Sequence, residues 1–97
     1  MTGYFLTDLA IADLREIIDY IALDNVGAAS RVLDEFEAAF ERLGELPELG
    51  HARTDLAAEE LRFWPVHSYF IIYRPNLNPI EIARIVSGFR DIPGLLS

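Results

Sequence analysis

Apolar residues recur at helical spacing between residues 8 and 24. They are Leu14, Ile17, Ile18 and Ile21, with charged residues between them. Thr7 or Asp8 can accept a hydrogen bond from a free backbone N–H at the start of this stretch, so either can cap a helix. This pattern predicts an amphipathic helix that packs on another element by one face.

A second stripe with the same spacing follows between residues 26 and 44. Its members are Val32, Leu33, Phe36, Phe40 and Leu43, and acidic residues occupy the opposite face. The sequence DNVG at 24–27 predicts a break or tight turn before it, and Gly44 with Pro47 predicts its end. Two successive stripes predict an antiparallel helical hairpin whose apolar faces need a partner.

The pattern changes to that of strands after residue 60. Runs rich in aromatic and β-branched residues cover 61–66, 68–74 and 80–87, and a further short strand is predicted at 4–6. The links at 67–68 and 75–79 are short, which favours antiparallel neighbours. We therefore expect one α+β domain over residues 1–97, in the order β-α-α-β-β-β, with the hairpin packed on a mainly antiparallel sheet.

Strand alternation assigns side chains to faces of the predicted sheet. Strict alternation places Ile80, Ile82, Arg84 and Val86 on one face of the last strand. By the same rule the adjacent Phe63 and Trp64 point to opposite faces. One of the two should belong to the core, and the other should point outward or be covered by a partner.

Arg62 and Arg84 both lie on strand-like runs with apolar flanks. They could form an arginine pair on one sheet face, directed at phosphate or at a partner's carboxylates. They could equally be snorkelling side chains that pair with neighbouring acids. The sequence leaves both interpretations open.

Composition narrows the class of protein. The chain has 97 residues, of which 52% are hydrophobic, so it can bury a core. No uninterrupted apolar run approaches the roughly 18 residues that span a bilayer, and no positive charge precedes the first acid, as a secretory signal would require. The absence of cysteine excludes disulfides and thiolate metal sites. A cytoplasmic protein without membrane contact is the simplest expectation.

The net charge of −8 is unevenly distributed. Residues 1–50 hold three Arg and eleven acids, whereas residues 51–97 hold five of each, and the chain has no Lys. Phosphate contacts depend on Lys and Arg, so a net-negative domain binds polyanions poorly. We expect no direct nucleic-acid binding by this chain.

His51 and His67 are the only side chains whose ordinary pKa lies near neutrality. A general base also needs a positioned substrate and an orienting partner, and neither is evident from sequence. No H-x-x-x-H motif, His/Asp cluster, glycine-rich phosphate loop or nucleophile elbow is present. We expect no metal and no cofactor.

Four segments together resemble a known family. They are the helix ADLREIIDYIALDN, the loop LPELGHAR, the strands LRFWPVHSYFIIYRP and the ending IEIARIVSGFRDIPGLL. From Leu6 to Leu96 they resemble the ParE branch of the RelE/ParE toxin superfamily. The resemblance implies the toxin of a type II toxin–antitoxin system, of the kind associated with plasmid stabilisation. It also implies a ParD-like ribbon-helix-helix antitoxin that wraps the toxin, and DNA gyrase as the target.

RelE-like relatives instead cut mRNA on the ribosome, generally with Lys and Arg from the sheet and a Tyr or His near the C-terminus. Arg53, Arg62 and Arg84 could stabilise phosphorane charge here. However, no Lys exists, no His or Tyr follows Arg84, and Phe89 occupies the region where a proton-transfer residue is expected. These features favour the gyrase inhibitor.

Two alternatives stay open: a ribosome-dependent mRNA endonuclease that uses His51 or His67 as base, and a non-toxic partner that has lost its target activity. For the favoured gyrase inhibitor, the residues predicted to contact target or antitoxin are Arg53, Arg62, Trp64, Arg84, Phe89 and Arg90, with no catalytic residue.

Overall fold

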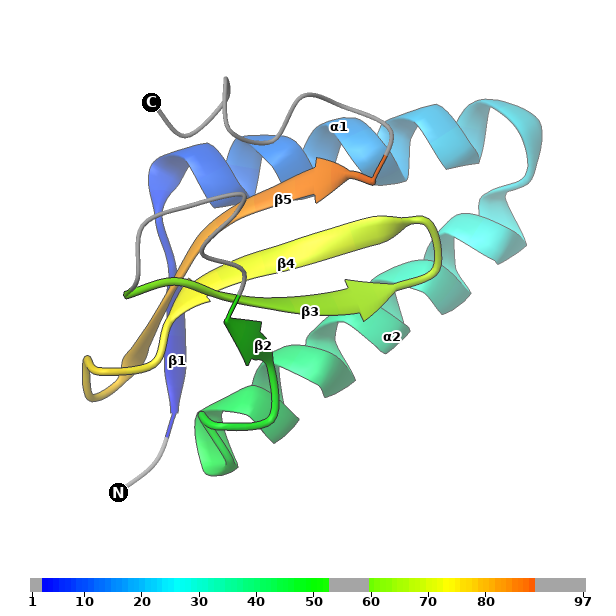
Figure 1. Ribbon diagram of the computed structural model, residues 1–97. Coiled ribbons are helices and arrows are strands. Elements are labelled where there is room, and N and C mark those ends of the chain that lie inside the picture. The colour runs from blue at the N-terminus through cyan, green and yellow to red at the C-terminus, as the bar shows by residue number, and fades with distance from the viewer. Residues whose placement is uncertain (1–2, 53–59, 89–97) are drawn as a thin grey trace.

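The computed structural model describes residues 3–52 and 60–88, in which two helices pack on a five-stranded sheet (Figure 1). The strand order across the sheet is β1-β5-β4-β3-β2. The elements in chain order are β1 (Tyr4–Leu6), α1 (Asp8–Asp24), α2 (Val26–Glu45), β2 (His51–Ala52), β3 (Arg62–Val66), β4 (Tyr69–Arg74) and β5 (Ile80–Ser87). The predicted α+β class, helical hairpin and three later strands are confirmed.

Local side-chain chemistry explains where the helices begin and end. The Thr7 hydroxyl accepts from the Ala10 N–H at 3.1 Å and starts α1. The Asn25 side chain accepts from the Ala28 N–H at 2.9 Å and starts α2, while its own N–H donates to the Ile21 carbonyl at 2.9 Å. Asn25 therefore ends one helix and begins the next, so the hairpin turn is a single residue.

Gly44 does not end α2 as predicted, because the helix continues to Glu45. Gly44 is buried, and a Cβ at this position would lie 2.9 Å from the backbone of Gly3. Because Gly44 has no side chain, the backbone of Gly3, just before β1, can pack directly against the last turn of α2.

The sheet is mixed. β3 pairs with β4 and β4 with β5 in antiparallel fashion, as predicted, whereas β1 pairs with β5 in parallel. A two-residue strand, β2, pairs His51 and Ala52 with β3 inside a segment that the sequence marks only as a loop. Two residues carry no periodicity, so no pattern could predict this strand.

A bulge in β5 overturns the predicted faces of that strand. Tyr73 pairs with Ile82, but Ile72 pairs with Arg84, so Ala83 is an extra residue. Ile82 and Ile85 consequently share the helix-side core with Ile80, and Val86 lies in the opposite cluster. The prediction that Ile80, Ile82, Arg84 and Val86 share one face is wrong, because one inserted residue inverts the alternation that follows it.

The core has two parts, one on each face of the sheet. The main cluster joins the helices to the sheet through Ala10, Phe36, Phe40, Leu43, Ile71, Tyr73, Ile80, Ile82 and Ile85. The second cluster, on the other face, contains Leu61, Phe63, Ile72 and Val86. β4 is therefore buried on both faces, as its nearly continuous apolar sequence predicts. Among the described residues, no helix is long and apolar enough to cross a membrane.

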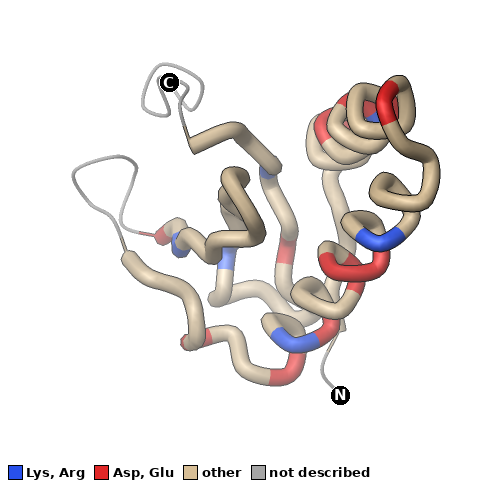
Figure 2. The backbone as a smooth tube through the Cα atoms, turned by 90° about the vertical axis from the view of Figure 1, so that its right-hand side faces the viewer, with Lys and Arg blue, Asp and Glu red and all other residues tan. Residues whose placement is uncertain are grey.

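Charge follows the division between helices and sheet. Figure 2 shows that most of the acidic positions lie along the two helices, while the strands carry few charges. The helical layer is therefore the strongly acidic side of the molecule.

Candidate functional site

Arg62 holds the loop that leads into β2. Its Nη1 donates to the Gly50 carbonyl at 2.7 Å and lies 3.4 Å from the Glu48 carbonyl. On the same loop, the Tyr73 hydroxyl donates to the Pro47 carbonyl at 2.7 Å and accepts from the Gly50 N–H at 2.8 Å. The PELG segment is thus fixed by two side chains from the sheet.

Tyr73 is fully buried at the centre of this arrangement. Burial raises the pKa of its phenol above the ordinary value of 10.0, while the hydrogen bond from Gly50 and the charge of Arg62 oppose that rise. The phenol therefore stays protonated at neutral pH and can donate to the loop.

Arg84 is committed to α1. Its Nε donates to Asp13 Oδ2 at 2.7 Å and its Nη2 donates to Asp13 Oδ1 at 3.0 Å, which is a bidentate pair. Both side chains are largely buried, with 18% and 15% of their surfaces exposed. The hydrogen bond to Asp13 raises the pKa of Arg84, so the guanidinium is permanently charged.

The same carboxylate also completes the edge of the sheet. Asp13 Oδ2 accepts from the Ile85 N–H at 3.0 Å, beyond the point where β1 stops pairing with β5. Two residues earlier in β5, the Ala83 carbonyl accepts from the Thr7 hydroxyl at 2.8 Å. Together, Thr7 and Asp13 attach α1 to the bulge of β5.

Arg62 and Arg84 do not form a pair on one sheet face. Arg62 is opposite Tyr73 and so lies on the helix side, whereas Arg84 is opposite Ile72, which belongs to the second cluster. The interpretation of an arginine pair directed at one ligand is therefore wrong. Arg84 follows the alternative, pairing with an acid, and Arg62 is bonded to backbone carbonyls.

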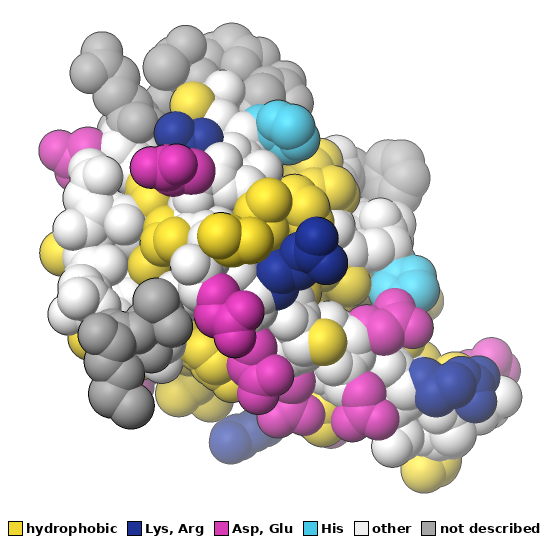
Figure 3. Space-filling view, turned by 90° about the horizontal axis from the view of Figure 1, so that it is seen from below, with side chains coloured by type: hydrophobic (Ala, Val, Ile, Leu, Met, Phe, Trp, Pro, Cys, Tyr) yellow, Lys and Arg dark blue, Asp and Glu magenta, His cyan; other side chains and the backbone are white. Residues whose placement is uncertain are grey.

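Trp64 and His67 lie beside α2. Phe63 is the core member of the adjacent aromatic pair, and Trp64 packs half-buried against the main cluster. Trp64 lines a shallow groove of about 600 Å³ between β3 and α2, whose charged side chains include Glu41, Arg42 and Glu45. Figure 3 views the molecule from below and shows acidic side chains gathered there beside hydrophobic ones.

The two histidines lie on different elements and do not form one site. His67 forms an ion pair with Glu35 of α2 and occupies the β3–β4 turn with a positive φ of 55°. His51 is exposed on β2. Arg53, Phe89 and Arg90, which were also predicted as contacts, lie outside the described residues.

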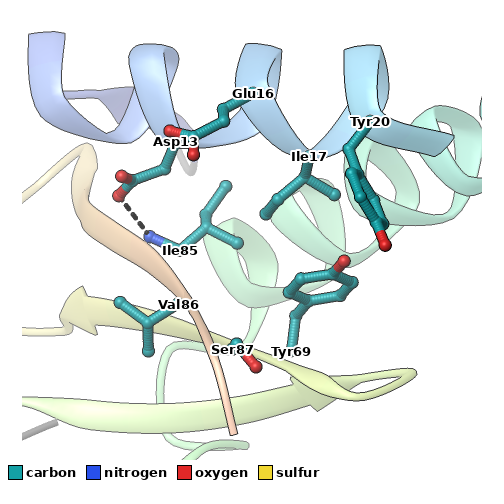
Figure 4. A pocket seen from close by; sticks show the side chains of 8 residues that line it. All are labelled: Asp13, Glu16, Ile17, Tyr20, Tyr69, Ile85, Val86 and Ser87. Atoms are coloured by element: carbon teal, nitrogen blue, oxygen red, sulfur yellow. Dashed lines mark hydrogen bonds between the residues drawn. The ribbon is translucent and has the colours of Figure 1, made fainter. Parts of the chain in front are cut away.

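A second hollow lies between α1 and the end of β5 (Figure 4). It has a volume of about 330 Å³ and is lined by Asp13, Glu16, Ile17, Tyr20, Tyr69, Ile85, Val86 and Ser87. Sequence reasoning missed this pocket, because its walls come from three elements that are distant in sequence. The only local signal was Tyr20, an aromatic residue beside the apolar stripe of α1.

Within the part of the chain that the structure describes, no group of three or more His, Asp or Glu side chains could hold a metal ion. The two hollows described above combine apolar walls with charged side chains that are mostly acidic. Such surfaces suit contacts with polypeptides better than contacts with phosphate groups.

The sequence model of the ParE toxin of type II toxin–antitoxin system parDE matches residues 4–92. This chain belongs to the ParE toxin family. Among solved structures, the chromosomal ParDE TA system from P. aeruginosa superposes with a TM-score of 0.73 and 22% sequence identity, covering 90% of this chain and 96% of that chain. At that identity the likeness shows that the ParE fold is shared. A search of curated proteins finds no match.

Membership of the ParE family makes this chain the toxin of a type II toxin–antitoxin system. The family assignment agrees with the resemblance seen in the sequence from Leu6 to Leu96.

Proposed function

We propose that this ParE toxin inhibits DNA gyrase through protein–protein contacts in the cytoplasm and that a ParD-like antitoxin neutralises it. The proposal rests on the hydrogen bonds that two arginines of the sheet make within the protein. Arg62 is bonded to loop carbonyls, and Arg84 is held in a bidentate pair with Asp13. Both arginines are thus occupied by contacts within the toxin.

RNA cleavage places different demands on a site. The charge that develops on the phosphorus must be met by cations directed at one point, and a base and an acid must lie within reach of it. Arg62 is bonded to the loop before β2 and Arg84 to Asp13 of α1, so the two guanidinium groups are not directed at a common point. The net charge of −8 also opposes approach to ribosomal RNA. These features favour a protein target over an RNA substrate.

The gyrase assay tests the target directly. Toxin freed from antitoxin is added to purified DNA gyrase with relaxed plasmid, and supercoiling and cleaved DNA are measured on gels. We expect supercoiling to fall, cleaved plasmid to accumulate, and both effects to disappear when the ParD-like antitoxin is present. Full supercoiling with intact DNA at saturating toxin would eliminate gyrase as the target.

Mapping mRNA 5′ ends after induction of the toxin tests the other branch of the superfamily. We expect no new ends, together with a DNA-damage response. New ends that depend on translating ribosomes would replace the proposal with an mRNA endonuclease.

A further inference from the structure

The tip of the helical hairpin exposes large apolar side chains. Tyr20 is 72% exposed, Leu23 is 87% exposed and Val26 is 73% exposed, all within seven residues of chain at one end of the molecule. Scattered exposed apolar residues are ordinary, but a cluster of this kind marks a contact surface. We call it the Tyr20 surface.

Two hollows flank Tyr20. One is the pocket between α1 and the end of β5, where Figure 4 shows the Tyr20 ring projecting from α1 on the same side as Tyr69. The other, of about 520 Å³, lies at the tip and is lined by Tyr20, Ile21, Leu23, Asp24, Asn25 and Ala28. Because Tyr20 lines both, the two hollows form one continuous surface with two places for apolar side chains.

The rim of the Tyr20 surface is acidic. Residues 16–28 contain Glu16, Asp19 and Asp24 and no basic residue. Glu16 and Asp24 are four residues before and after Tyr20, so all three share one side of α1. Neither acid has an ion-pair partner among the described residues, whereas Asp13, deeper in the pocket, is already paired with Arg84. The rim therefore offers two carboxylates to an incoming cation.

We propose that the Tyr20 surface is the docking site for a basic amphipathic helix of a partner protein. Apolar residues of that helix fill the two hollows on either side of Tyr20, and Lys or Arg side chains meet Glu16 and Asp24. Glu16 and Asp24 are eight positions apart, which is about 12 Å along α1, so the cations of the partner are about two helical turns apart. This arrangement is the helix-in-groove mode of recognition with charge complementarity at its rim.

The charges argue against a second copy of this chain as the occupant. Two such tips would bring the same acids together, and like charges across an interface are unfavourable. The inference concerns the chemistry of the surface and holds whether or not gyrase is the target.

Two synthetic helical peptides of roughly 18 residues, long enough to form a helix on binding, provide the probe. One carries Leu on one face and Lys on the other, and its counterpart has Glu at every Lys position. Fluorescence anisotropy measures the binding of each to the full-length toxin. We expect the Lys peptide to bind, with an affinity that falls as salt rises, and the Glu peptide to bind at least about tenfold more weakly.

Variants of the toxin locate the site. Tyr20→Ala should weaken binding of the Lys peptide by about tenfold or more, as expected for an aromatic anchor. The double variant Glu16→Lys, Asp24→Lys should reverse the preference in favour of the Glu peptide. The matched control is the double variant Asp34→Lys, Glu37→Lys, which makes the same change of charge at exposed positions of α2 outside the three hollows. Circular dichroism confirms that each variant is folded.

Equal binding of the two peptides would overturn the proposal. An equal loss of Lys-peptide binding in the control and in the Glu16→Lys, Asp24→Lys variant would also overturn it, because the net charge alone would then explain the attraction. Sedimentation of the toxin by itself gives the remaining test. A dimer that Tyr20→Ala dissociates would assign the surface to a second copy instead.

Discussion

Tyr73 connects the core to the loop that precedes β2. Its ring belongs to the main cluster, and its hydroxyl bonds both to Pro47 and to Gly50. A buried hydroxyl that satisfies two backbone groups is costly to disturb, because each group left without a partner loses its hydrogen bond and stays out of water. The loop is therefore sensitive to single-atom changes.

Gly50→Ala tests the close approach of this loop to Tyr73. A Cβ at residue 50 would lie 2.7 Å from Tyr73 Cε1, which is too close without movement of the buried ring. We expect a loss of about 1–3 kcal/mol in the free energy of unfolding, measured in urea. The control is Gly3→Ala, whose Cβ would meet Pro79 at an ordinary 3.8 Å. Equal stability of the two variants would contradict the close contact.

The raised pKa of Tyr73 predicts a loss of stability at alkaline pH. The folded state holds the phenol proton more tightly than the unfolded chain does, so the stabilisation is fully present below about pH 10 and is lost as pH rises through the folded pKa. We expect wild type to lose more stability than Tyr73→Phe between pH 8 and pH 11. Tyr4, whose pKa burial also raises, contributes equally in both. Parallel pH curves for the two proteins would show that Tyr73 does not contribute.

At the scale of elements, α1 takes over from β1 as the neighbour of β5 along one edge of the sheet. β1 pairs with β5 only from Ile80 to Ile82, and beyond it the edge of β5 is met by α1. The bulge at Ala83 lies where this change occurs. The Thr7 hydroxyl donates to the Ala83 carbonyl, and the Asp13 carboxylate accepts from the Ile85 N–H just beyond it. A bulge is a common way to redirect a strand at the edge of a sheet.

Asp13→Asn tests this attachment. It removes the charge that holds Arg84 and leaves a largely buried guanidinium without its counter-ion. We expect a loss of about 2–4 kcal/mol in the free energy of unfolding, since an unpaired buried charge is strongly destabilising. Glu16→Gln, one turn further along α1 and exposed, should change stability by less than about 0.5 kcal/mol. A small effect of Asp13→Asn would mean that Arg84 finds another partner.

At the scale of the whole molecule, the acidic helical half stands against a neutral sheet half. Residues 1–50 carry the entire net charge of −8, so the helical layer repels itself. We expect the free energy of unfolding to rise when NaCl is raised from about 0.01 to 0.15 M, because the Debye length falls to about 8 Å.

Single substitutions check that salt effect. Glu37→Gln, on the acidic face of α2, should reduce the gain in stability with salt. Glu81→Gln should not, because Glu81 is already paired with Arg74 at 2.9 Å. A fall in wild-type stability with added salt would mean that attractive ion pairs outweigh the repulsion.

The sequence by itself determined the helical hairpin, the three later strands, the double-sided burial of β4 and the family. Periodicity, caps and turn residues act over a few positions, so a local pattern is enough to reveal them. Only the tertiary structure decided the parallel pairing of β1, the bulge in β5, the separation of Arg62 from Arg84 and the hollows around Tyr20. One inserted residue at Ala83 inverts a strand face, and the partner of a charged side chain depends on which distant element is packed beside it. These features depend on contacts between elements that are distant in sequence, which local patterns do not encode.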